Sequence, residues 1–270
     1  MEIAFIGGGV MGEAMVSGLL RQKLAAPRSI TISDVSTERL GVMAQKYGVA
    51  VTGDNGQAIA GKEVVVLAIK PQSLGEVAPG LRGKLAPGQL VISIIAGARL
   101  PTLTEALQHA GVVRVMPNTP AQIGEGISVW TTTSTVSEAQ KEQTRTLLAS
   151  LGREVYVTDE KYIDMATAVS ASGPAYVFLI MEALIDGAVH VGMPRDMAQE
   201  LVVQTVLGSA LFLRASGRHP AELRNMVTSP GGTTAEGLLQ LEEGKLRAVL
   251  AQAVIAGYRK AQLLGGSTKQ

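Results

Sequence analysis

Several residue types are absent from this 270-residue chain or rare in it, and each absence excludes a kind of site. Cysteine does not occur, which excludes disulfide bonds and cysteine-ligated zinc. Histidine occurs only at His109, His190 and His219, and no two of these have the spacing of metal ligands, so we expect no metal site. There is also no nucleophile-elbow motif.

Charge is scarce as well. Charged residues make up 17% of the chain and the net charge is +1, so we expect neither nucleic acid nor an anionic membrane surface as a partner. The uninterrupted apolar runs look shorter than the ~20 residues that a membrane span needs, so we predict no span. The chain enters a strand without a charged leader, and we therefore expect a cytoplasmic protein.

The N-terminus carries a glycine-rich turn between a strand and a helix. The apolar run Glu2 to Ile6 is followed by GGGVMG at residues 7–12 and then by a helical pattern. This order is typical of a dinucleotide-binding turn. Gly7 would permit the tight turn, Gly9 would let a pyrophosphate reach the helix N-terminus, and Gly12 would allow the helix to pack closely on the strand.

An acidic residue supports dinucleotide binding. The second predicted strand, 29–33, is followed by Asp34, about twenty residues after the last motif glycine, where such folds place the carboxylate that binds the ribose hydroxyls. Asp34 would repel a 2′-phosphate and favour NAD(H). Ser33, Ser36 and Arg39 could still accommodate the phosphate of NADP(H), so the sequence leaves the choice between NADP(H) and NAD(H) open.

The overall pattern predicts an α/β fold with two domains. Short apolar strands alternate with helices up to residue 159, which favours a Rossmann-like, mostly parallel sheet covered on both faces. After that point only helical patterns occur. We predict a dinucleotide-binding domain over 1–159 and an all-α dimerisation and substrate domain over 160–270. The further predicted strands are 49–51, 64–69, 90–95, 112–116, 127–131 and 154–158, and the predicted helices between them are 37–47, 72–81, 102–110 and 138–151.

Two loops at the predicted ligand-binding edge of the sheet carry polar residues. Lys70 follows the fourth strand, where open α/β sheets bind ligands, although a solvated loop lysine is the alternative. Asn118 and Thr119 lie between two prolines after the sixth strand and suggest either a rigid wall beside the nicotinamide or a stiff connector. The expected cofactor-binding residues are Ile6, Gly7, Gly9, Val10, Met11, Gly12, Ser33, Asp34, Asn55, Ala68, Lys70, Pro71, Ala96 and Asn118.

The predicted helix 174–192 is apolar on nearly every face. Its titratable residues Glu182, Asp186 and His190 are spaced by four and share one stripe, which we interpret as an interface network rather than a catalytic set. A helix that is apolar nearly all round is buried. The simplest cover is a second copy of the chain, so we expect a homodimer at least.

The hexapeptide SPGGTT at residues 229–234 is the second candidate site. Pro230 would end the preceding helix, the two glycines would let the backbone turn tightly, and a new helix is predicted over 234–241. Free N–H groups and hydroxyls would then meet at a helix N-terminus, where carboxylates and phosphates bind. An ordinary capped turn is the alternative. The expected substrate-binding residues are Ser229, Gly231, Gly232, Thr233 and Thr234.

The sequence resembles the pyrroline-5-carboxylate reductase family along essentially its whole length. The matching motifs are GGGVMGEAM, AIKPQ, SIIAG (93–97), RVMPNTPA, SASGPAY (170–176) and NMVTSPGGTTAEGL, of which the last two are specific to that family. The resemblance implies hydride transfer from NADPH or NADH to the C5=N bond of 1-pyrroline-5-carboxylate, which gives L-proline in the last step of proline biosynthesis. It also implies a substrate site at a dimer interface, and dimers that can assemble into a decamer.

The residues fit this chemistry. The substrate carboxylate matches the N–H groups of Gly232 and Thr233, and the Thr234 hydroxyl is the catalytic candidate, as a neutral donor near the ring nitrogen. Related hydroxyacid dehydrogenases carry a catalytic lysine three residues after a glycine, whereas Tyr176 takes that place after Gly173, which favours imine over ketone reduction. A cofactor-sensing binding protein and a broader imine reductase remain alternatives, and the hexapeptide disfavours both.

Overall fold

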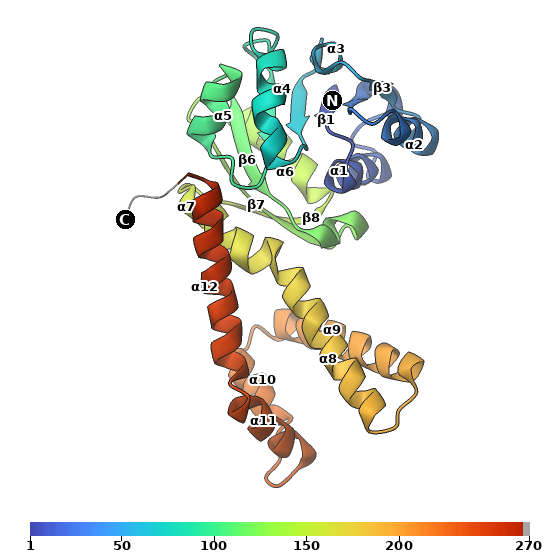
Figure 1. Ribbon diagram of the computed structural model, residues 1–270, viewed down its shortest axis with the longest axis vertical. Coiled ribbons are helices and arrows are strands. Elements are labelled where there is room, and N and C mark those ends of the chain that lie inside the picture. Colours follow the sequence, from blue (N-terminus) through green and yellow to red (C-terminus); the bar gives the residue numbers. More distant parts are fainter. Residues whose placement is uncertain (267–270) are drawn as a thin grey trace. The chain divides into compact units, whose positions relative to one another are not determined.

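The structure is a computed structural model that describes residues 1–266 (Figure 1). Within these residues one eight-stranded sheet has the order β3-β2-β1-β4-β5-β6-β7-β8. Neighbouring strands are parallel except β6 and β7, which are antiparallel, so the prediction of a mostly parallel sheet is confirmed. The strands are β1 (Ile3–Ile6), β2 (Ile30–Ser33), β3 (Ala50–Thr52), β4 (Val64–Leu67), β5 (Leu90–Ser93), β6 (Val112–Met116), β7 (Gly126–Thr132) and β8 (Gly152–Tyr156).

The helices of the first part alternate with these strands, and those of the second part follow one another. A π-helical segment, Thr167–Ala171, joins α7 to α8. The α-helices are α1 (Val10–Arg21), α2 (Thr37–Tyr47), α3 (Asn55–Ile59), α4 (Leu74–Leu81), α5 (Leu100–Leu107), α6 (Glu138–Ala149), α7 (Lys161–Ala166), α8 (Gly173–His190), α9 (Arg195–Ser216), α10 (Pro220–Met226), α11 (Thr233–Glu243) and α12 (Leu246–Leu264).

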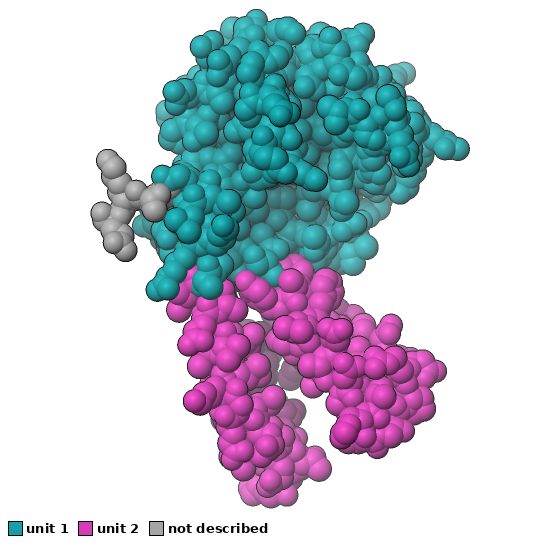
Figure 2. Space-filling model, in the orientation of Figure 1, with its two compact units in different colours: residues 1–172, 256–270 teal, residues 173–255 magenta. Residues whose placement is uncertain are grey.

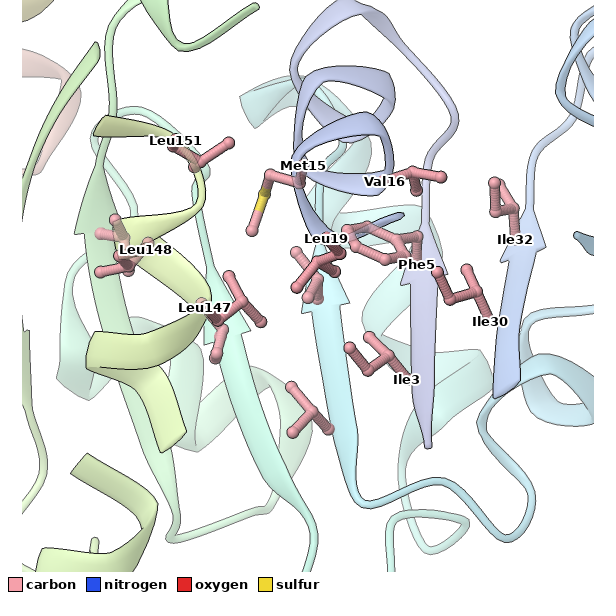
Figure 3. Close-up of a cluster of buried hydrophobic side chains, with 14 of the residues drawn as sticks. Ile3, Phe5, Met15, Val16, Leu19, Ile30, Ile32, Leu147, Leu148 and Leu151 are labelled. Carbon is pink, nitrogen blue, oxygen red and sulfur yellow. The ribbon is translucent and has the colours of Figure 1, made fainter. Parts of the chain in front are cut away.

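The sheet is covered by helices on both faces because its central strands β1 and β4 are apolar and buried at every position. Successive side chains of a strand point to opposite faces. Phe5 therefore joins one cluster with residues of α1, α2 and α6, where Figure 3 shows it near Met15 and Leu19. Ile6 joins the opposite cluster with residues of α3, α4 and α5. Full burial of a side chain such as Phe5 contributes roughly 1.5–3 kcal/mol relative to exposure.

The described residues form two compact units, residues 1–172 with 256–266, and residues 173–255 (Figure 2). The first unit therefore extends beyond the predicted boundary at residue 159. The reason is α7, whose Ile163 is fully buried against Met116 of β6 and Val129 of β7. The end of α12 also belongs to the first unit, which no local sequence pattern indicated.

Helix α8 has no buried residue, and its apolar side chains Phe178 and Leu179 are 62% and 65% exposed. The continuous helical stretch Lys161–His190 is long and apolar enough to cross a membrane, with a mean hydropathy of 1.6 in its most apolar window. Length and composition alone therefore do not exclude a span. The expectation that no membrane is a partner stays a prediction, and it requires that something other than lipid covers the apolar side chains of α8.

Candidate active site

The glycine turn joins β1 to α1 in a conformation that only glycine suits. Gly7 has φ of 100°, and a Cβ there would lie 2.5 Å from the carbonyl oxygen of Ala68. A Cβ on Gly12 would lie 2.6 Å from the carbonyl oxygen of Gly7, so this glycine lets α1 pack against the turn. At Gly9, the N-cap of α1, a Cβ would meet nothing within 4 Å. The turn therefore leaves an open cradle at a helix N-terminus, where first-turn N–H groups lack intrahelical acceptors, and this fits a pyrophosphate.

Asp34 holds this turn in place. Its Oδ2 accepts a hydrogen bond of 2.7 Å from the N–H of Gly8, and its Oδ1 accepts one of 2.9 Å from the N–H of Ser36. Each carboxylate oxygen has a second lone pair, so Asp34 is still able to accept ribose hydroxyls. The sequence indicated the position of Asp34 but not its bond to Gly8.

Arg39 also binds this turn, through a backbone carbonyl group. Its Nε donates to the carbonyl oxygen of Gly8, and its guanidinium pairs with Glu13. Glu13 also accepts hydrogen bonds of 2.8 Å from Lys46 and from Tyr47. The bond from Lys46, followed by that from Arg39, lowers the pKa of Glu13 to about 2. The Arg39 charge is thus partly balanced by Glu13, which weakens its attraction for a 2′-phosphate.

The other predicted cofactor-binding residues lie at the carboxyl ends of neighbouring strands. The strand order reverses between β1 and β4, and ligands of open α/β sheets bind at such a point. Ser33, at the end of β2, donates a hydrogen bond of 2.6 Å to Asn55 of α3. Lys70 and Ala96 follow β4 and β5, and Lys70 is exposed.

Asn118 is held more firmly than the sequence suggested. Its Oδ1 accepts a hydrogen bond of 2.8 Å from the N–H of Ile127, and its Nδ2 donates to the carbonyl oxygen of Ser170 at 3.2 Å. The residue is only 9% exposed. Because both ends of the amide are engaged, Asn118 fixes the loop after β6, and its second amide N–H and second Oδ1 lone pair remain able to contact a cofactor.

The hexapeptide lies in the second unit, between α10 and α11. Its Gly231 has φ of 66°, and Gly232 is the N-cap of α11. The N–H of Gly232 donates to the carbonyl oxygen of Ser229 at 3.1 Å, so the expectation that this N–H is free for an anion is wrong. The N–H groups of Thr233 and Thr234, at the first two positions of α11, have no backbone acceptor among the described residues. Thr234 is also not the capping residue, because that position belongs to Gly232.

A buried ion network that the sequence did not reveal joins the sheet to α7. Arg114, 1% exposed in the middle of β6, pairs with Glu160 at 2.8 Å and with Asp164 at 2.7 Å. Arg99 pairs with the second oxygen of Asp164 at 2.9 Å. The only signal was an arginine within the otherwise apolar run VVRVM. This network holds α7, which continues through the π-helical segment Thr167–Ala171 towards α8.

Comparison with known proteins supports the relationship suggested by the motifs. A family model described as pyrroline-5-carboxylate reductase dimerisation matches residues 160–264, and one described as NADP oxidoreductase coenzyme F420-dependent matches residues 2–97. The pyrroline-5-carboxylate reductase of a Synechocystis strain is 40% identical over 265 residues, covering 98% of each chain. The chain belongs to the pyrroline-5-carboxylate reductase family.

Solved structures of this family have the same fold. A pyrroline-5-carboxylate reductase from Coxiella burnetii superposes with a TM-score of 0.89 and 37% identity, covering 97% of this chain and 98% of the other. A pyrroline carboxylate reductase from Plasmodium falciparum, solved with NADP bound, has a TM-score of 0.87 and 30% identity and covers 98% of each chain. The prediction of a sheet domain followed by a helical dimerisation domain is therefore confirmed.

Proposed function

We propose that this pyrroline-5-carboxylate reductase family member reduces 1-pyrroline-5-carboxylate to L-proline with NADPH or NADH, as the last step of proline biosynthesis. The observation that carries the proposal is the combination, in one chain of this family, of a dinucleotide turn and a threonine-rich helix N-terminus. The first fits a nicotinamide cofactor, and the second offers neutral donors to a small anionic substrate.

The cofactor would bind along the carboxyl ends of the strands. N–H groups at the start of α1 would hold the pyrophosphate beside Gly9, and Asp34 would accept hydrogen bonds from the adenosine ribose. When bound, the cofactor supplies the hydride that adds to C5 of the imine. Asp34 disfavours a 2′-phosphate, whereas Arg39 attracts one, less strongly because of Glu13. Both NADPH and NADH are therefore proposed as cofactors.

The substrate would bind at the start of α11. Its carboxylate would accept hydrogen bonds from the N–H groups of Thr233 and Thr234, with Ser229 and Gly231 shaping the turn. The Thr234 hydroxyl is the proposed catalytic group, because a donor near the ring nitrogen stabilises the electron density that this nitrogen gains as hydride arrives. The remaining rate enhancement would come from holding both reactants in attack geometry.

A second copy of the chain would cover α8. The support is the exposed apolar face of α8, together with the match of residues 160–264 to a dimerisation family. We propose a cytoplasmic homodimer that is able to assemble further, as far as a decamer, with neither membrane nor nucleic acid as a partner. Sedimentation equilibrium should find no monomer at micromolar concentration, and a folded monomer would refute this assembly.

Deuterium labelling tests the reaction itself. NADPH carrying deuterium at C4 of the nicotinamide, on the transferred face, should yield proline with one deuterium at C5, detected by mass spectrometry and NMR. NADPH labelled on the other face should yield unlabelled proline. Product without deuterium from both labelled cofactors, or deuterium at any other carbon, would refute hydride transfer to the imine.

A further inference from the structure

A cavity of about 280 Å³ lies at the carboxyl ends of β4 and β5, and the end of the described chain forms one of its walls. One side is made by the loops after the two strands, which include Pro71 and Ala96. The other side is made by residues 264–266 at the end of α12. A cavity of roughly 150 Å³ is sufficient for a benzene ring, so this one has room for a ring of nicotinamide size.

The wall from α12 is fitted closely to its surroundings. Gly97 has φ of 77°, and a Cβ there would lie 2.9 Å from Cβ of Leu264 and 3.1 Å from its backbone carbonyl. A Cβ on Gly265 would lie 2.8 Å from Nε of Arg99, whose guanidinium is anchored by Asp164. The end of α12 therefore packs closely against the loop after β5.

The cavity lies on the side of the sheet to which a bound dinucleotide would extend. Under the proposed function, the glycine turn and Asp34 hold the adenosine half beside β1 and β2. The strand order reverses next to β1, so the nicotinamide half would cross to β4 and β5, where Pro71 and Ala96 line the cavity. The chain's own C-terminal segment thus adjoins the reactive end of the cofactor.

We propose that Leu264–Gly266 is a positioning element for the nicotinamide half of the cofactor. It acts by packing on Gly97, which keeps the loop 95–98 in the shape that borders the nicotinamide site. This inference rests on the proposed function, because it requires a nicotinamide dinucleotide. It predicts that disturbing the contact weakens binding of the nicotinamide end without weakening binding of the adenosine end.

Two independent variants, each with a matched control, test the proposal. Gly97→Ala forces Leu264 to move, whereas Gly83→Ala places a Cβ in the same left-handed conformation (φ of 71°) with nothing within 4 Å. A chain ended after Leu263 lacks the wall, and a chain ended after Gly266 retains it. Calorimetric titration would measure the Kd of the preferred reduced cofactor and the Kd of an ADP-ribose, which lacks the nicotinamide. The ADP-ribose would carry a 2′-phosphate if NADPH is preferred and none if NADH is preferred.

The expected result is a Kd for the reduced cofactor that rises about tenfold in Gly97→Ala and in the chain ended after Leu263. The Kd for the ADP-ribose should stay within about twofold in all four variants, and both controls should bind both ligands like the wild type. Combining Gly97→Ala with the shorter chain should add no further loss, because both changes remove one contact. If Gly97→Ala fails to fold, the shortened chain alone decides.

Three outcomes would overturn the inference: unchanged affinity for the reduced cofactor in the variants, equal loss of the ADP-ribose, or additive effects in the combined variant. Failure of the wild type to bind either reduced cofactor would instead refute the proposed function. The two failures are therefore distinguishable in the same titrations.

Discussion

Replacement of Thr234 by alanine is the most discriminating test of the proposed catalytic role. Thr234 is the second residue of α11, and the N-cap is Gly232, so its hydroxyl is free of a capping role. A neutral hydrogen bond that strengthens in the transition state contributes about 2–4 kcal/mol. Loss of the hydroxyl should therefore lower kcat by roughly thirty- to a thousandfold.

The measurements are steady-state turnover at saturating cofactor, cofactor affinity, and thermal unfolding. Thr234→Ala should bind cofactor with wild-type affinity and melt within a few degrees of the wild type, because no cap is lost and alanine favours a helix. Thr234→Ser retains the donor and should keep much of the activity. Thr233→Ala removes the neighbouring hydroxyl but no N–H group, and should lower kcat less than Thr234→Ala.

A near-normal turnover rate in Thr234→Ala would refute the catalytic role of Thr234. If the free energy of unfolding of that variant were also lower by about 1 kcal/mol, Thr234 would be a helix-stabilising residue and not a catalytic one.

Three further predictions follow from the other contacts. Asp34→Asn removes the charge but keeps an acceptor for the glycine turn, so the ratio of kcat/KM for NADPH to that for NADH should rise roughly tenfold. Asp34→Ser should shift this ratio in the same direction. An unchanged ratio in both variants would mean that the carboxylate serves only the turn. Asp164→Asn leaves the buried Arg114 with one partner and should lower the free energy of unfolding in urea by about 3 kcal/mol, whereas Asp159→Asn, in an exposed ion pair, should change it by less than about 1 kcal/mol. The pKa of Glu13 falls from 4.5 to about 2 on folding, so its contribution to the free energy of unfolding is complete above pH 4.5 and is lost as the pH falls towards 2. In Glu13→Gln, the free energy of unfolding should therefore decrease less over this pH range than in the wild type. Parallel curves of unfolding free energy against pH would contradict the prediction.

The fold was predictable where contacts are local. Buried parallel strands are continuous apolar runs, and the turn from β1 to α1 carries its own glycines. The runs 64–69 and 90–95 overestimated the length of β4 and β5, because apolar residues continue past the last paired residue and pack against the two core clusters. Helix α3 was missed because it is only five residues long, although Asp54 caps it with hydrogen bonds to two backbone N–H groups.

The site was predictable in its motifs but not in its contacts. Two hydrogen bonds of the glycine turn join residues that lie far apart in sequence: Gly8 donates to Asp34, and Arg39 donates to the carbonyl oxygen of Gly8. The packing of Gly97 against Leu264 depends on the path of α12, which no periodicity reveals. In the hexapeptide, the turn itself uses the N–H of Gly232, so counting donors from the sequence overestimated those available to a ligand.

Substrate discrimination tests the central claim most directly. Initial rates of NADPH and NADH oxidation would be compared for 1-pyrroline-5-carboxylate, for 1-pyrroline, which lacks the carboxylate, and for a ketoacid of similar size. We expect rapid oxidation with 1-pyrroline-5-carboxylate and no measurable rate with the ketoacid. With 1-pyrroline, kcat/KM should be at least about a hundredfold lower, because two N–H groups lose their anionic partner. Equal rates with 1-pyrroline, or turnover of the ketoacid, would contradict this expectation.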